Sequence, residues 1–314
     1  MLRWLKSDFT INLQLRYKYA ISRSTVSLWI GFMSQQQVMN TRDIQMAISR
    51  ARTEQVLEKL GFGQPPALTE HGLTQLYQAW CRTVPFDNLL RRIQVAKGAH
   101  AELPGFIPDH FFASWLRYGT GGTCWAGHGA LYALLNALGF SVQLGLTTMR
   151  SPRPVSADSP GHGTLFVRLG ETMFIVDATM LHGQPLPLQA WYSPHPVWGT
   201  RVHRDEGVWC VNWKPLGRSR VDCQLLEMDA AGYEYPQRHE QSRGNSRFDG
   251  AMLIRLAGRE SITGIVKGEK VVRDVAGKEI FTPLTHRQQQ VLLIERFGIA
   301  EEIVVQLPMD ERER

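Results

Sequence analysis

The chain has 314 residues, enough for two or three domains. Hydrophobic residues make up 43% of it and charged residues 20%, as in soluble globular proteins, and the sequence has no apolar run as long as a membrane span, which argues against an integral membrane protein. The net charge of +6 is spread along most of the chain without a basic-aromatic motif, so we expect at most a mild attraction for acidic ligands such as nucleotides, and no nucleic-acid binding.

The N-terminal segment differs from the rest in composition. Residues 1–38 carry five basic residues against one aspartate, and the apolar patch Val26–Met33 is short, interrupted, and not followed by a small-residue cleavage site. A secretory signal is therefore not expected. We predict a poorly ordered extension over residues 1–42. One alternative is a transit peptide, and another is that the sequence starts upstream of the true first residue, for which Met39 is a candidate.

Helical spacing dominates residues 43–140, which we predict to form one domain. Apolar residues at Ile44, Ala47, Ile48 and Ala51 fall on one helical face. A second helix is expected to begin at Thr69, and a third at Asp109–Tyr118. A fourth follows Cys124, with four leucines at helical spacing: Leu131, Leu134, Leu135 and Leu138.

The stretch Thr120–Phe140 is the most informative of the chain. Gly121 and Gly122 allow a tight turn directly before Cys124, and Gly139 stands where a left-handed glycine ends a helix. We therefore place Cys124 at or next to a helix N-terminus, whose N–H groups stabilise a thiolate and can hold an oxyanion. Two interpretations fit: a nucleophile, or a small buried thiol.

Cysteine usage excludes several site types. The four cysteines form no CxxC pair and no close cluster with histidine, so we expect neither a zinc site nor a disulfide framework. They are Cys81, Cys124, Cys210 and Cys223. A free reactive thiol suits a reducing compartment, so we expect a cytoplasmic protein.

After Phe140 the period of the pattern changes from 3.6 to 2, and residues 141–240 are predicted to be an antiparallel β domain. Val142–Leu146 reads as a strand and Ser151–Gly161 as a loop. Thr164–Leu169 and Thr172–Asp177 flank Gly170-Glu171, a hairpin signal.

Residues 241–314 are predicted to form a smaller mixed domain. Polar, loop-rich sequence fills residues 224–250, followed by a strand at Gly264–Val272, a helix at Pro283–Phe297 and a strand at Glu302–Gln306. Helices first, antiparallel strands second and a mixed segment last indicate an α+β protein of three subdomains.

The hairpin supplies a base for the cysteine and an orienter for that base. If Gly170-Glu171 is a two-residue turn, Thr164 faces Asp177, and His162 becomes the diagonal neighbour of Asp177 on the same face. Asp177 could then accept from one imidazole nitrogen and leave the other for Cys124. With this partner and the helix N-terminus, we expect the pKa of the thiol to lie below the roughly 8.5 of a free cysteine.

His128 is a rival base, because it lies four residues after Cys124 on the same helical face. The alternative for His128 is a buried histidine that packs among the helices and bonds a carbonyl oxygen.

Eight short motifs follow one another along the chain. They are Val84-Pro-Phe-Asp-Asn-Leu89, Gly121-Gly-Thr-Cys124, Leu138-Gly-Phe140, His162-Gly-Thr-Leu-Phe-Val167, Phe174-Ile-Val-Asp177, Pro185-Leu-Pro-Leu188, Asn245-Ser-Arg-Phe248 and Glu295-Arg-Phe-Gly-Ile299. In this order, over most of residues 55–310, they resemble the arylamine N-acetyltransferase family. The resemblance implies a helical bundle, a β-barrel and an α/β lid, with Cys124, His162 and Asp177 as nucleophile, base and orienter of a papain-like triad.

Three positions depart from the family's pattern. Thr120 replaces its usual arginine, Ala126 its glutamate and His128 its asparagine. The triad survives, but the charged residues around it do not. Trp125 after the cysteine also resembles transglutaminase-like proteins, which share the Cys-His-Asp order.

The resemblance implies an acyltransferase that moves an acetyl group from acetyl-CoA to an arylamine or related amine through a cysteine thioester, by a ping-pong route. Acyl-CoA would be a substrate, not a bound cofactor, and no metal is implied. One alternative is an amide synthase that releases a carrier-bound acyl chain in secondary metabolism. Others are a transglutaminase-like cysteine hydrolase and a non-catalytic binding protein, the last opposed by the intact Cys-His-Asp set.

Overall fold

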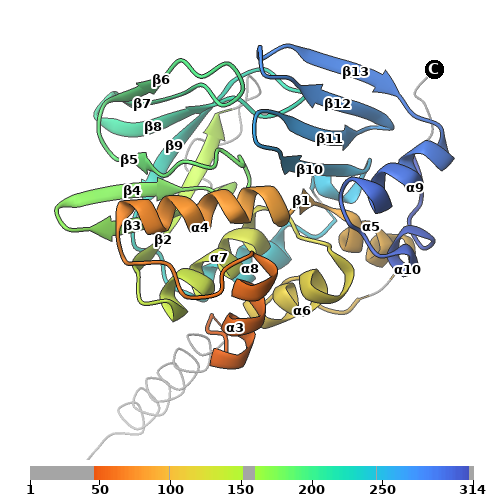
Figure 1. The fold of residues 1–314 in the computed structure, drawn as a ribbon, viewed down its shortest axis with the longest axis horizontal. Coiled ribbons are helices and arrows are strands. Elements are labelled where there is room, and N and C mark those ends of the chain that lie inside the picture. The colour runs from red at the N-terminus through yellow and green to blue at the C-terminus, as the bar shows by residue number, and fades with distance from the viewer. Residues whose placement is uncertain (1–45, 99, 151–159, 245, 311–314) are drawn as a thin grey trace, which may run out of the picture. The chain divides into compact units, whose positions relative to one another are not determined.

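The computed structural model describes residues 46–98, 100–150, 160–244 and 246–310, and Figure 1 shows their arrangement. The predicted extension, residues 1–42, lies outside the described residues, as does most of the predicted loop Ser151–Gly161. Within the described ranges, no helix combines the length and the apolar character that crossing a membrane requires.

The first half of the chain is mainly helical, as predicted. Its helices are α3 (Arg50–Lys59), α4 (Glu70–Thr83), α5 (Leu89–Ala96), α6 (Pro108–Tyr118) and α7 (Cys124–Ala137). Ser49 and Thr69 cap α3 and α4, each accepting the backbone N–H of the residue three positions later. Because the cap stands at Ser49, Ala47 and Ile48 precede the helix, and their predicted place on a helical face is wrong.

Eight antiparallel strands form the central sheet, in the order β5-β4-β3-β2-β9-β8-β7-β6, which curls into a nearly closed barrel. They are β2 (Ser141–Arg150), β3 (His162–Leu169), β4 (Thr172–Val176), β5 (Leu186–Pro187), β6 (Trp191–Ser193), β7 (Thr200–Asp205), β8 (Val208–Trp213) and β9 (Val221–Glu227). The predicted antiparallel β segment is confirmed, and with it the α+β class.

Helix α7 lies between the helices and the barrel. It contacts α6 and α8 (Glu234–Gln241) on one side and strands β2 and β3 on the other. Small and apolar residues cover almost its whole circumference, as in helices buried on every side. His128 in the second turn of α7 lies beside His162 at the start of β3, with ring centroids 5.2 Å apart.

The structure contains a second, five-stranded sheet with the order β1-β10-β11-β12-β13 (Figure 1). It combines β1 (Phe86–Asp87) with the C-terminal strands β10 (Leu253–Ala257), β11 (Ile262–Val266), β12 (Glu269–Arg273) and β13 (Glu279–Pro283). Apolar residues of α5, α9 (His286–Glu295) and α10 (Glu301–Val304) form one core with this sheet. The division into residues 43–140, 141–240 and 241–314 stays a prediction.

The C-terminal part contains three corrections. The predicted strand Gly264–Val272 is a hairpin, because Lys267 and Gly268 adopt positive φ angles and turn the chain. The predicted strand Glu302–Gln306 lies instead across α10, where Ile303, Val304 and Leu307 are buried at helical spacing. The predicted loop 224–250 contains the end of β9, helix α8 and the 3-10 helix η1 (Arg247–Asp249).

Candidate active site

Cys124 is the first residue of α7, as predicted, and it is only 6% exposed. The loop before it lies against β1: a Cβ atom on Gly121 would come within 1.8 Å of the Pro85 carbonyl oxygen, so glycine is required there. Asp87 holds the same loop, since its Oδ2 accepts the Gly121 N–H at 2.6 Å. The loop before Cys124 is thus fixed by the Pro-Phe-Asp-Asn motif.

The thiol of Cys124 differs from the expectation. Burial raises its pKa to about 12, and the N–H groups of Trp125 and Cys124 itself only partly offset this effect. The expected pKa below the ordinary value is therefore wrong, because loss of hydration outweighs the helix N-terminus. At neutral pH the resting enzyme carries a protonated thiol.

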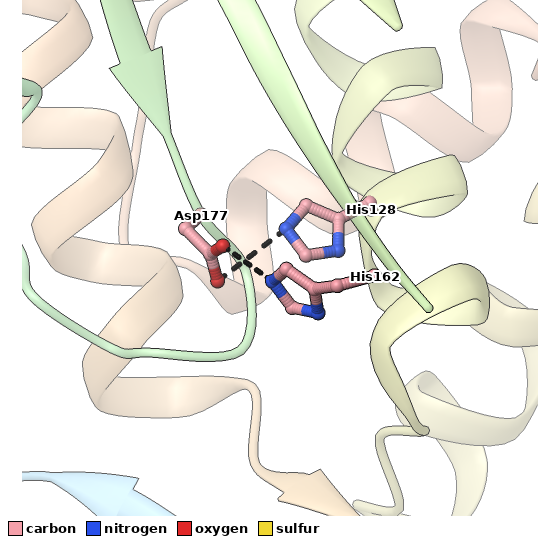
Figure 2. Close-up of side chains that lie close together, drawn as sticks. All are labelled: His128, His162 and Asp177. Atoms are coloured by element: carbon pink, nitrogen blue, oxygen red, sulfur yellow. Dashed lines mark hydrogen bonds and ion pairs between the residues drawn. The ribbon is translucent and has the colours of Figure 1, made fainter. Parts of the chain in front are cut away.

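The hairpin that carries the base has the predicted register. Leu165 pairs with Val176 and Leu169 with Thr172, which makes Gly170-Glu171 the two-residue turn. His162 Nε2 lies 2.7 Å from Asp177 Oδ2, and both residues are buried (Figure 2). The diagonal contact predicted from the sequence is confirmed.

The carboxylate of Asp177 is fully bonded. Its Oδ1 accepts the backbone N–H groups of Thr179 (2.8 Å) and Met180 (2.9 Å), and its Oδ2 faces His162. Burial alone would raise the pKa of Asp177, but the neighbouring imidazoles outweigh burial and hold it well below its usual value. Asp177 is therefore ionised and fixed in orientation, as an orienter of His162 must be.

The imidazole of His162 is a neutral base at neutral pH. Burial lowers its pKa below the ordinary 6.5, and the interaction with Asp177 only partly compensates. Since Nε2 is bonded to the carboxylate, it carries the proton that it donates to Asp177, and Nδ1 keeps a free lone pair.

His128 is a buried histidine with a structural role. Its Nδ1 lies 2.7 Å from the Cys124 carbonyl oxygen and must donate to it, while its Nε2 accepts the Ala178 N–H at 3.0 Å. Both nitrogens are thus occupied in a neutral ring. The 3.4 Å between its Nε2 and Asp177 Oδ1 joins two acceptors, so this contact is not a hydrogen bond. His128 ties α7 to the segment after β4, and the carbonyl-bonding alternative is confirmed.

Replacing His128 with alanine should therefore lower stability first. The change leaves the buried Ala178 N–H without an acceptor and opens a cavity, which we expect to cost about 3 kcal/mol or more. Thermal melting of His128→Ala against His71→Ala, an exposed histidine of α4, measures the effect. Equal melting temperatures would show that His128 does not hold the two elements together.

The same three side chains form the group of potential metal ligands among the described residues: His128, His162 and Asp177 have ligand atoms within 4.8 Å of one another. His128 Nε2 already accepts a backbone N–H, and the other two side chains share a 2.7 Å hydrogen bond. This bonding pattern is that of a proton-transfer pair, and a metal ion would have to break it.

Several residues that support the site were not predicted. Tyr77 of α4 donates to the backbone oxygen of Asp177 at 2.7 Å. Tyr235 of α8 packs edge-on against Trp125, with ring centroids 5.1 Å apart. Arg91, buried and paired with Asp249 at 2.6 Å, favours the thiolate of Cys124. Their partners lie far away in the chain, so no local pattern marks them.

The departures from the family's pattern lie in tight packing. Thr120 and Ala126 are buried, and a Cβ atom on Gly122 would come within 3.2 Å of the Ala126 methyl group. Position 126 therefore lies in a closely packed part of the site.

A cavity of about 470 Å³ is lined in part by Thr179 and Met180, the two residues whose N–H groups hold the carboxylate of Asp177. Residues of the five-stranded sheet also line this cavity, among them Arg255 of β10. Arg255 is a further residue that the sequence did not single out.

Comparisons with known proteins agree with this architecture. The N-acetyltransferase family model matches residues 71–208. No curated protein matches the chain. Among solved structures, the arylamine N-acetyltransferase of Mycobacterium abscessus superposes with a TM-score of 0.67 at 17% identity, over 81% of this chain and 92% of its own. The enzyme of Salmonella typhimurium gives 0.67 at 17%, over 82% and 98%. That of Bacillus cereus, described as having a Cys-His-Glu catalytic triad, gives 0.64 at 17%, over 81% and 100%.

Proposed function

We propose that the chain is an acyltransferase that acetylates an arylamine or related amine through a thioester on Cys124, because residues 71–208 match the N-acetyltransferase family model and the fold is that of arylamine N-acetyltransferases. Acetyl-CoA is the donor substrate, and a small-molecule amine is the acceptor. The observation that carries the proposal is the buried His162–Asp177 pair, which lies against His128 of α7, four residues after Cys124. The cytoplasm, where acetyl-CoA is made and thiols stay reduced, is the proposed location.

The first half-reaction begins with neutral partners. His162 Nδ1 takes the proton of the Cys124 thiol as the sulfur attacks the acyl carbon of the thioester. The bond from sulfur to the acyl carbon forms, the bond from that carbon to the CoA sulfur breaks, and His162 returns the proton to the departing CoA thiolate. Asp177 stabilises the imidazolium that exists between these transfers.

The second half-reaction uses the same groups in the same order. The amine attacks the thioester on Cys124, and His162 accepts the proton that the nitrogen loses. Collapse of the tetrahedral intermediate releases the amide, and the Cys124 thiolate recovers the proton from His162. The N–H groups at the start of α7 are suited to stabilise the oxyanion in both steps.

An amide synthase acting on a carrier-bound acyl chain is the alternative that an observation favours. Ala126 occupies a buried position where the family has a charge, so the surroundings of the thiol differ from those of its relatives. The protein partner would then be an acyl carrier. A transglutaminase-like hydrolase would show release of acyl groups to water without an amine.

Intact-mass measurement after incubation with acyl-CoAs tests the proposal. We expect a gain of one acetyl group with acetyl-CoA, removed again when an arylamine is added. An adduct formed only from a carrier-bound thioester would favour the amide synthase. No adduct from any thioester would overturn the acyltransferase proposal.

The pH dependence of thioester formation follows from His162. Because burial lowers its pKa, the imidazole stays neutral, and able to accept the thiol proton, below pH 6.5. The rate at limiting acetyl-CoA should hold its plateau down to this pH and fall only at lower pH. Quenched-flow mass spectrometry, with folding checked by melting at each pH, measures the profile. An acid limb centred above pH 6.5 would contradict His162 as the base.

A further inference from the structure

Arg255 is a buried cation on β10, the second strand of the five-stranded sheet. It lies on β10 opposite Phe86 of β1, is 7% exposed, and places its guanidinium 4.5 Å from the centre of the Phe86 ring. On its other side stands Gly264 of β11, where even a Cβ atom would come within 3.1 Å of the Arg255 side chain. The sheet therefore makes room for this side chain.

The other buried arginines of the described chain have carboxylate partners. Arg91 pairs with Asp249, Arg92 with Asp310 and Arg273 with Glu279. Arg255 has neither a hydrogen bond nor an ion pair among the described residues, and its Nε is buried without an acceptor. Burial lowers its pKa to about 10, so it stays charged at neutral pH. An unpaired buried charge is costly, and such a group fits a ligand that completes it.

The 470 Å³ cavity supplies the place for that ligand. Arg255 and Thr179 both line it, and the hydroxyl of Thr179 is a second buried polar atom that has no partner in the described part of the chain. Arg218 and Arg247 add positive charge to the wall, whereas no carboxylate belongs to the described lining. The charge of Arg255 lowers the pKa of His162, so the cation lies within electrostatic reach of the proposed base.

We propose that Arg255, with Thr179, binds a carboxylate carried by the substrate and makes the enzyme select carboxylate-bearing substrates. This inference rests on the proposed acyltransferase function and names its substrate class. The planar guanidinium accepts a carboxylate through two parallel hydrogen bonds, and the threonine hydroxyl can donate a third. The carboxylate belongs either to the acceptor amine or to the acyl group.

Paired substrates separate these two sources. Aniline against 4-aminobenzoate, with acetyl-CoA as donor, tests the acceptor, and acetyl-CoA against malonyl-CoA, read as the mass adduct on Cys124, tests the donor. In one of the two arms we expect a preference for the carboxylate of about tenfold or more in kcat/KM, the size of a charged hydrogen bond. Arg255→Met should bring that ratio close to one, and Arg255→Lys should restore part of it. Arg259→Met, an exposed arginine just after β10, should leave the ratio unchanged.

Binding provides a readout independent of turnover. Benzoate should raise the melting temperature of the wild-type protein and benzamide should not, and Arg255→Met should lose the benzoate effect. Without ligand, Arg255→Met should melt higher than the wild type, because the unpaired charge is gone. If Arg255→Met does not fold, the comparison of benzoate with benzamide on the wild-type protein and the substrate preference of Arg255→Lys test the inference instead.

Three results would overturn the inference: no carboxylate preference in either arm, a preference that survives Arg255→Met, or a loss confined to the affinity for acetyl-CoA. The last would place Arg255 against the phosphates of CoA. Failure of the acyltransferase proposal is distinguishable from all three, because then no acyl-CoA forms an adduct with the wild-type enzyme.

Discussion

Cys124→Ser should form no acyl adduct and should lose turnover by about 10³-fold or more, the size of effect that follows removal of a catalytic nucleophile. A serine hydroxyl is a far weaker acid than a thiol, and the lowered pKa of His162 makes this imidazole a weak base for it. Intact mass and amide formation are the two measurements. Cys210→Ser, another buried cysteine, should keep the adduct.

Alkylation gives a second reading of the same residue. We expect iodoacetamide to label Cys124 before Cys81, Cys210 or Cys223, because Cys124 is the most exposed of the four. Prior incubation with acetyl-CoA should protect Cys124 from labelling. The labelling rate should rise with pH, because burial keeps the thiol protonated at neutral pH. Amide product from Cys124→Ser, or labelling mainly at another cysteine, would contradict the proposed nucleophile.

Asp177→Asn should fold and still lose turnover by about 10³- to 10⁴-fold. The amide oxygen can accept the N–H groups of Thr179 and Met180 in place of Oδ1. The amide NH₂ then faces His162 Nε2 and donates to it, which moves the imidazole proton to Nδ1, where it blocks transfer from the thiol.

Melting and single-turnover acylation of Asp177→Asn separate folding from chemistry. Asp229→Asn, an exposed aspartate after β9, is the matched control and should behave as the wild type. Near-normal acylation by Asp177→Asn would contradict the role of Asp177 in orienting His162 and would leave it a structural residue after β4.

The site could be predicted from the sequence wherever local geometry decides it. The two-residue turn at Gly170-Glu171 fixes the register, and the register alone brings His162 to Asp177. The glycine pair before Cys124 and the leucine spacing after it were sufficient to place the start of α7. These features depend on neighbours within about twenty residues, which the sequence displays.

What could not be predicted depends on residues distant in the chain. The pKa of Cys124 is set by burial under elements that the local pattern does not reveal. Arg255 is notable only because no carboxylate of the described residues forms an ion pair with it, which is a property of the packed molecule. The strand prediction at Glu302–Gln306 failed because a short apolar run fits both periods, and docking against the sheet decides which is adopted.

The pairing of β1 with β10 has a consequence for the order of folding. Phe86 and Asp87, which hold the loop before Cys124, lie in the first third of the chain, but their sheet partners leave the ribosome only near the end of synthesis. Closing so long a loop is slow compared with forming helices α3 to α7. A nascent or prematurely terminated chain can thus complete its helices and barrel while the edge strand beside the thiol is still unpaired. We therefore expect the loop before Cys124 to reach its final position late in folding.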